Sequence, residues 1–142
     1  MGWVLSSSGN GNVLSDGTRH YLSSSVTDGW VRSAKIPGAK NAQLKSFGLV
    51  HDSVYNTRAG FHSDVESVAV RAVPCTLVDA DDPTQSLSPS AQYRFWPVPV
   101  AGDIDPTRFL DASGNVANPN PLQLPDDGYC WQAQAHLSRV LP

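Results

Sequence analysis

Two histidines and an aspartate form the sharpest chemical pattern in this chain of 142 residues. His62 and Asp64 are separated by one residue, and His136 lies much further along the chain. Two imidazoles and one carboxylate would occupy one face of an iron ion and leave the other face open for a chelating cosubstrate and oxygen. In the competing interpretation, His62 and Asp64 form a hydrogen-bonded pair in a loop, and His136 lies on the polar face of a strand.

The H-x-D pattern with a distal histidine resembles the iron-binding triad of the 2-oxoglutarate-dependent oxygenases. This resemblance implies a β-barrel-like fold and an iron cofactor. In that family, an arginine that binds the cosubstrate lies on the strand after the distal histidine, whereas Arg139 falls on the same predicted strand as His136. A small metal-dependent oxygenase that uses His62, Asp64 and His136 is therefore the third of three functional hypotheses.

Other catalytic patterns are incomplete. His51-Asp52 matches the dipeptide of the metal-dependent phosphohydrolases in form only, because that family needs further ligands on helices. The 17 serines could be combined on paper with an aspartate and one of the histidines His20, His51, His62 and His136. However, no G-x-S-x-G turn accompanies them. We therefore expect a non-enzymatic protein with no catalytic residue and no cofactor.

Two acidic clusters contain residue types that bind calcium. Asp79, Asp81 and Asp82 form the first cluster, and Asp103 and Asp105 form the second. Neither has the glycine and the closing glutamate of the EF-hand loop. Since Asp82 and Asp105 each precede a proline, a combination that begins turns, we expect solvated turns and no bound metal.

Cys75 and Cys130 fall in different predicted strands. Their spacing matches no zinc motif, because such motifs contain close pairs of cysteines. The first interpretation is two buried thiols that act as small apolar side chains. The alternative is a disulfide between the two strands, which requires an oxidising environment.

The tryptophans Trp3, Trp30, Trp96 and Trp131 could stack on sugar rings if two of them share an exposed face. Trp131 alternates with apolar residues, so we expect it in the core, whereas the exposure of Trp3 and Trp96 is left open. This pattern supports the alternative functional hypothesis, a carbohydrate- or receptor-binding β-sandwich module.

The composition limits the elements that can position these residues. Ser, Asp, Gly, Pro and Asn make up 58 of the 142 residues, and 12 of the 13 acidic residues are Asp. These types favour turns and chain ends, which argues against helical bundles and coiled coils. The net charge is −3 and the ten cationic residues are scattered, so we expect no direct nucleic-acid binding. We expect no membrane partner, because no apolar run is long enough to span a bilayer, and residues 1–6 lack the features of a secretory signal.

Period-2 alternation predicts the main strands. Residues 129–138 should form a long strand with one face in the core and a polar face, with Gln132, Gln134 and His136, toward solvent, a groove or a neighbouring chain. Residues 65–78 predict a second strand, with a bulge or an edge position at Pro74.

Shorter patterns complete the expected set of strands. Residues 91–100 predict an edge strand whose pairing ends near Trp96, because two prolines follow. Residues 18–26 and 29–36 read as a hairpin, and residues 1–6 as a short edge strand. Residues 41–55 are ambiguous between a strand and a short helix.

Together these patterns predict one all-β, mainly antiparallel domain over residues 1–142. We expect a β-sandwich or jelly-roll-like barrel of about seven or eight strands, with at most one short helix near 41–55. Residues 101–125 contain four prolines and few apolar residues, and they are predicted to form a long extended segment or arm.

The leading functional hypothesis is a structural or assembly protein whose arm crosses a neighbouring subunit. Its partners would be copies of itself or other structural subunits. It would act in a virion, as a capsid, decoration, cement or tail-associated component, or in another extracellular particle. Possible interface residues are Pro97, Pro99, Pro106, Pro119, Pro121, Pro125, Gln132, Gln134 and His136.

Overall fold

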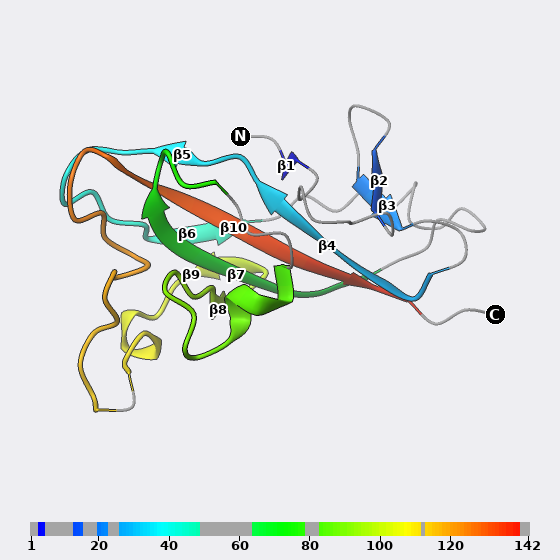
Figure 1. The fold of residues 1–142 in the computed structure, drawn as a ribbon. Coiled ribbons are helices and arrows are strands. Elements are labelled where there is room, and N and C mark those ends of the chain that lie inside the picture. The colour runs from blue at the N-terminus through cyan, green and yellow to red at the C-terminus, as the bar shows by residue number, and fades with distance from the viewer. Residues whose placement is uncertain are drawn as a thin grey trace.

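The computed structural model describes residues 3–4, 13–15, 20–22, 26–48, 64–78, 83–111 and 113–139. These residues form antiparallel β-structure with almost no helix (Figure 1), which confirms the predicted all-β class. The strands are β1 (Trp3–Val4), β2 (Val13–Ser15), β3 (His20–Leu22), β4 (Asp28–Ser33), β5 (Ile36–Pro37), β6 (Ser46–Gly48), β7 (Asp64–Pro74), β8 (Trp96–Val98), β9 (Ala101–Asp103) and β10 (Tyr129–Ser138). Two short 3-10 turns are η1 (Pro83–Leu87) and η2 (Pro106–Arg108).

A main sheet has the strand order β1-β4-β10-β7-β8, and β5 pairs with β10. Figure 1 shows β4, β10 and β7 as its three long, side-by-side strands. The pairing of β10 with β7 runs from Tyr129 opposite Pro74 to Ser138 opposite Asp64, so both predicted long strands exist and occupy the middle of the sheet. Two smaller pairs, β2 with β3 and β6 with β9, stand apart from this ladder.

One face of the main sheet is apolar. Cross-strand partners such as Val31, Ala135 and Val68 lie on this face. Val13 and Leu22 of the β2–β3 pair pack against them and are 1% and 0% exposed. This burial of aliphatic side chains is the ordinary driving force for a strand pair to pack on a sheet.

The opposite face of the main sheet is polar but equally buried. Gln134 is paired with Arg32, and Gln132 with Arg71, in the register of the sheet. Gln132 and Gln134 are each 1% exposed. The prediction that the polar face of residues 129–138 meets solvent or a partner is therefore wrong for these two glutamines. The segment from η1 to β8 covers them, and the arginines supply the hydrogen-bond donors that their side chains need.

Residues 101–125 do not form an extended arm in this structure. β9 pairs with β6, and Ile104, Phe109 and Leu122 form a buried apolar cluster against Trp96 and Val98. In the described part of this range, the predicted extended loop or arm is thus folded back as a loop, and its contact with a neighbouring subunit stays a prediction. Apolar side chains that look scattered in the sequence converge here because turns between them fold the segment back onto the sheet.

Several shorter predictions also change. β3 pairs with β2, whereas β4 pairs with β1 and β10, so the expected hairpin between residues 18–26 and 29–36 is absent among the described pairings. The ladder of β8 begins at Trp96 and includes Pro97, although β8 does lie at the sheet edge as predicted. Pro74 ends β7, where it pairs with Tyr129 but lies beyond the described pairing with β8, so the predicted edge position fits, whereas the register irregularity lies between Val65 and Ser67. β1 is an edge strand, as expected.

Cys75 and Cys130 are joined by a disulfide. The bond links the end of β7 to the start of β10, beside the pairing of Val73 with Cys130. The preferred prediction of two free thiols is therefore wrong, because the strand register brings the two Cα atoms to 5.1 Å, within the range that a disulfide spans.

Gly38 follows β5 at a place with no room for a side chain. A Cβ atom there would lie 2.7 Å from Leu124 Cδ1 and 2.9 Å from Trp131 Cζ3. We expect Gly38→Ala to lower the free energy of unfolding by about 1 to 2 kcal/mol, because the indole ring must move. Gly48→Ala is the matched control, since nothing lies within 4 Å of its new Cβ. Equal urea midpoints for the two variants would contradict this packing.

Candidate binding pocket

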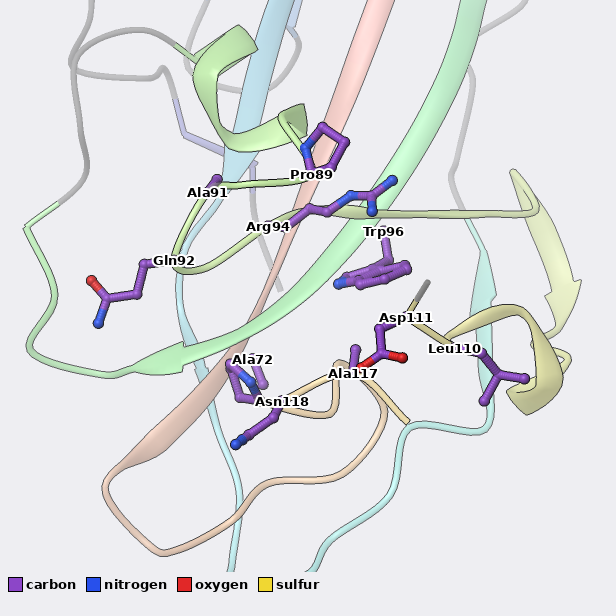
Figure 2. A pocket seen from close by; sticks show the side chains of 11 residues that line it. Ala72, Pro89, Ala91, Gln92, Arg94, Trp96, Leu110, Asp111, Ala117 and Asn118 are labelled. Carbon is purple, nitrogen blue, oxygen red and sulfur yellow. The ribbon is translucent and has the colours of Figure 1, made fainter. Parts of the chain in front are cut away.

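A pocket of about 440 Å³ lies beside β8, between the segment that precedes this strand and the segment around residues 110–119 (Figure 2). Its volume falls within the range of about 300–1,000 Å³ that is usual for small-molecule sites. The lining residues are Ala72, Pro89, Ala91, Gln92, Arg94, Trp96, Leu110, Asp111, Ala117, Asn118 and Pro119.

The wall before β8 is anchored through Phe95, which is 1% exposed. The guanidinium carbons of Arg32 and Arg71 lie 5.3 and 4.3 Å from the centroid of its ring. Such cation–π contacts strengthen when the groups are desolvated, as they are here. Phe95 therefore fixes this segment to the polar face of the main sheet.

Hydrogen bonds hold the same wall in register. Arg71 Nη1 donates to the Tyr93 carbonyl oxygen at 3.1 Å, and the Phe95 amide donates to the Ser86 carbonyl oxygen at 2.7 Å. The Ser86 hydroxyl accepts from Arg32 Nη2 at 3.0 Å and from Arg71 Nη1 at 3.4 Å. These hydrogen bonds attach the segment between η1 and β8 to the arginines of the main sheet, both at Ser86 and at Tyr93.

The two buried glutamines orient the arginines. Arg32 Nε donates to Gln134 Oε1 at 2.6 Å. Arg71 Nε and Nη2 donate to Gln132 Oε1 at 3.0 and 2.7 Å. These hydrogen bonds consequently hold each guanidinium in its position near the Phe95 ring. We call Arg32, Arg71, Phe95, Gln132 and Gln134 the buried arginine layer.

Arg94 and Trp96 lie on the other side of the main sheet from Phe95. Trp96 pairs with Val70 of the apolar face. The Arg94 guanidinium carbon lies 4.2 Å from the Trp96 ring centroid, and Figure 2 shows the guanidinium stacked over the indole next to Pro89. Arg94 Nε is buried and has no hydrogen-bond partner within the described part of the chain.

The facing wall carries a carboxylate that its own turn holds in place. Asp111 Oδ1 accepts hydrogen bonds from the amides of Ser113 at 2.9 Å and Asn115 at 3.0 Å. Leu110 and Val116 form an antiparallel bridge across this turn. Figure 2 places Asp111 on the side of the Trp96 ring opposite Arg94. The two charges therefore stand at different ends of the pocket.

Asp105 begins the turn that leads into this wall. Its Oδ1 accepts from the Thr107 amide at 2.9 Å and from the Thr107 hydroxyl at 2.8 Å, which makes it the N-cap of η2. Because these hydrogen bonds favour the ionised carboxylate, they lower the pKa of Asp105 below its usual value of 3.8. The prediction of a turn is confirmed for Asp105.

The pocket offers complementary hydrogen-bonding groups. Arg94 only donates, Asp111 only accepts when ionised, and the exposed carboxamides of Gln92 and Asn118 do both. Alanine, proline and leucine side chains supply apolar surface between them. This combination suits a compact ligand that both donates and accepts hydrogen bonds and has apolar faces.

No family model, curated protein or solved structure significantly matches this chain. The geometry of the pocket is therefore the main guide to function. Among the described residues, no helix is long and apolar enough to cross a membrane.

The nine residues predicted as an interface are divided by the structure. Gln132, Gln134 and Pro121 are buried within this chain, and His136 is half-buried. Pro119 lines the pocket. The remaining prolines, Pro97, Pro99, Pro106 and Pro125, are exposed.

His136 lies in a cluster of its own. Its ring stacks on Trp30 with centroids 4.1 Å apart, and its Nδ1 lies 3.1 Å from a Glu66 carboxylate oxygen. His62 lies outside the described residues, as does the side chain of Asp64, so the predicted iron triad is not assembled from described groups. No group of three or more metal-binding side chains is found in the part of the chain that is described.

The remaining residues singled out in the sequence are two possible metal-binding patterns and the tryptophans. His51-Asp52 and the first acidic cluster, Asp79, Asp81 and Asp82, lie outside the described residues, as does the side chain of Trp3. Trp131 is half-buried rather than fully in the core. Of the tryptophans, Trp96 lines the pocket.

Four pocket residues are not recognisable as site residues in the sequence: Arg94, Gln92, Asp111 and Asn118. Each is a single polar residue in a loop and belongs to no motif. The only local signal is the run Arg94-Phe95-Trp96, in which a cation and two aromatic residues alternate between the two sides of the sheet.

Proposed function

We propose that the protein is a non-enzymatic carbohydrate-binding module whose ligand binds in the pocket beside Arg94 and Trp96. The observation that carries this proposal is the joint presence, around one pocket of about 440 Å³, of a guanidinium, a carboxylate, two carboxamides and apolar walls. Sugar hydroxyls donate and accept hydrogen bonds at once, and the C–H faces of a sugar ring contact apolar side chains.

The rigidity of the pocket walls supports a binding role. The buried arginine layer anchors one wall, and the burial of Phe109 against Trp96 anchors the other. The bonds from Ser113 and Asn115 orient Asp111 within its own turn. A preformed pocket loses little conformational entropy when a ligand binds. The finer fold that we propose is β-sandwich-like, because the β2–β3 pair and the cluster of Ile104, Phe109 and Leu122 pack on residues of the main sheet.

The disulfide between Cys75 and Cys130 supports an oxidising location. Disulfides persist outside the cytosol, where glycans are displayed on cells and particles. We therefore place the protein in an extracellular setting or on the surface of a particle.

A glycan panel with an Asp111→Asn variant tests this function. The asparagine keeps the Oδ1 acceptor of the turn and replaces the second oxygen with an amide NH2 group that only donates, so affinity should fall about tenfold while the thermal midpoint stays unchanged. Asp103→Asn, at an exposed position of β9 outside the pocket, is the matched control and should bind normally. The proposal fails if no glycan binds or if both variants lose affinity equally.

A second candidate is the assembly subunit that composition and prolines predict. Leu110 and Val116 are 44% and 53% exposed and lie opposite one another in a bridge, which makes an exposed apolar pair. Such a pair favours burial against another copy of this chain. Light scattering after size-exclusion chromatography should then show an oligomer that Val116→Asp dissociates, and a monomeric wild-type protein would rule out this candidate.

A further inference from the structure

We propose that the pocket takes an acidic saccharide and that Arg94 binds its carboxylate. This inference rests on the proposed function and specifies the class of sugar. It starts from Arg94, whose only contact within the described part of the chain is the ring of Trp96. A guanidinium carries five donors and a permanent charge, so one whose donors reach no acceptor among the described residues is suited to bind an anion.

The surroundings of Arg94 favour an anion over a neutral group. Its Nε atom is buried and has no hydrogen-bond partner among the described residues. A partly desolvated guanidinium of this kind gains most from a charged acceptor, which would approach its terminal Nη1 and Nη2 groups. The Trp96 ring, 4.2 Å from the guanidinium carbon, holds the fork in one plane. A planar carboxylate matches such a fork with two parallel hydrogen bonds.

Asp111 sets the orientation of the ligand. Its carboxylate lies across the indole from Arg94, and the amides of Ser113 and Asn115 keep it there. Repulsion between like charges excludes the acidic group of the ligand from the Asp111 end and leaves that end for hydroxyl groups. A molecule with one carboxylate and several hydroxyls satisfies both ends of the pocket.

Uronic acids and sialic acids share this chemistry, so both are included in the test. Isothermal titration would compare oligogalacturonate with neutral oligogalactose, and sialyllactose with lactose. We expect at least one acidic member to bind about tenfold to hundredfold more tightly than its neutral partner, and the better series identifies the source of the carboxylate.

Variants of Arg94 assign the carboxylate to this side chain. Arg94→Gln should lower affinity for the acidic member far more than affinity for the neutral member, so that the preference disappears, and Arg94→Lys should restore part of the preference. Arg108→Gln is the matched control, because Arg108 is exposed in η2 and does not line the pocket. In the wild type, salt should weaken binding of the acidic member more than that of the neutral one, which provides a test that needs no variant.

The outcomes separate the two proposals. Equal affinity for acidic and neutral sugars, or a preference that survives in Arg94→Gln, would overturn the inference and leave the carbohydrate-binding function intact. Binding of an acidic peptide with no binding of any glycan would overturn both proposals.

Discussion

Phe95→Ala is expected to lower the free energy of unfolding by about 3 to 5 kcal/mol. Truncation of a buried aromatic ring leaves a cavity and removes its transfer energy, and Phe95 is 1% exposed. The change also removes the ring that the guanidiniums of Arg32 and Arg71 contact. Urea denaturation followed by circular dichroism measures the loss.

Phe95→Leu separates the contribution of buried apolar volume from that of the ring's contact with the two guanidiniums. Leucine keeps most of the apolar volume but has no ring, so we expect an intermediate loss of about 1 to 2 kcal/mol. Both variants should weaken ligand binding, because the flanking residues Arg94 and Trp96 then lose their anchor. A loss below about 1 kcal/mol for Phe95→Ala would show that the buried arginine layer does not hold this segment.

Arg71→Met is expected to lower the free energy of unfolding by about 3 to 5 kcal/mol. The variant leaves Gln132 Oε1 and the Tyr93 carbonyl oxygen without the donors that reach them at 2.7 and 3.1 Å. The loss of its donor by a buried acceptor such as Gln132 Oε1 costs about 1 to 3 kcal/mol, and the partly buried Tyr93 carbonyl oxygen adds to this loss. Chemical denaturation of the variant measures the sum.

A double-mutant cycle with Gln132→Leu tests whether the loss of stability in Arg71→Met comes from the broken pairing of Arg71 with Gln132. If the loss comes from unpaired polar groups, the double variant should be more stable than the sum of the single losses predicts, with a coupling energy of about 1 to 3 kcal/mol. Arg108→Met, at an exposed position in η2, is the control and should change stability by less than about 0.5 kcal/mol. Additive losses would contradict the pairing of Arg71 with Gln132.

The sequence predicts the central strands well because their signal is local. Alternation over residues 129–138 and around Val68 identifies β10 and β7, and the prolines after Trp96 identify an edge. Strand pairing is harder to predict from the sequence, since it depends on partners far apart in the chain. The disulfide illustrates this, because the register of β7 and β10 decides whether Cys75 and Cys130 meet.

The prediction that the polar face of residues 129–138 is accessible is wrong for the same reason, because it too depends on partners far apart in the chain. Glutamine usually faces solvent, so Gln132 and Gln134 indicate an exposed face. Their burial depends on hydrogen bonds from Arg71 and Arg32, which lie 61 and 102 residues away in sequence. Local alternation contains no information about such partners.

The pocket could be predicted only in part. Trp96 stands out by residue type, and stacking on sugars is a reasonable expectation for it. Arg94 and Asp111 come together only because residues 101–124 fold back beside β8, through the contacts of Ile104 and Phe109 with Trp96 and Val98. The prolines of that segment indicate an arm, whereas its few apolar residues determine its actual path.

The most direct test of ligand binding in this pocket is a titration of the ¹⁵N-labelled protein with the acidic saccharide, followed by two-dimensional NMR. We predict that the largest shifts occur at the Nε–H of Arg94, the indole N–H of Trp96, and the backbone amides of Asp111 and Asn118. Shifts centred on the Trp30–His136 cluster instead, or no shifts at saturating saccharide, would contradict this account.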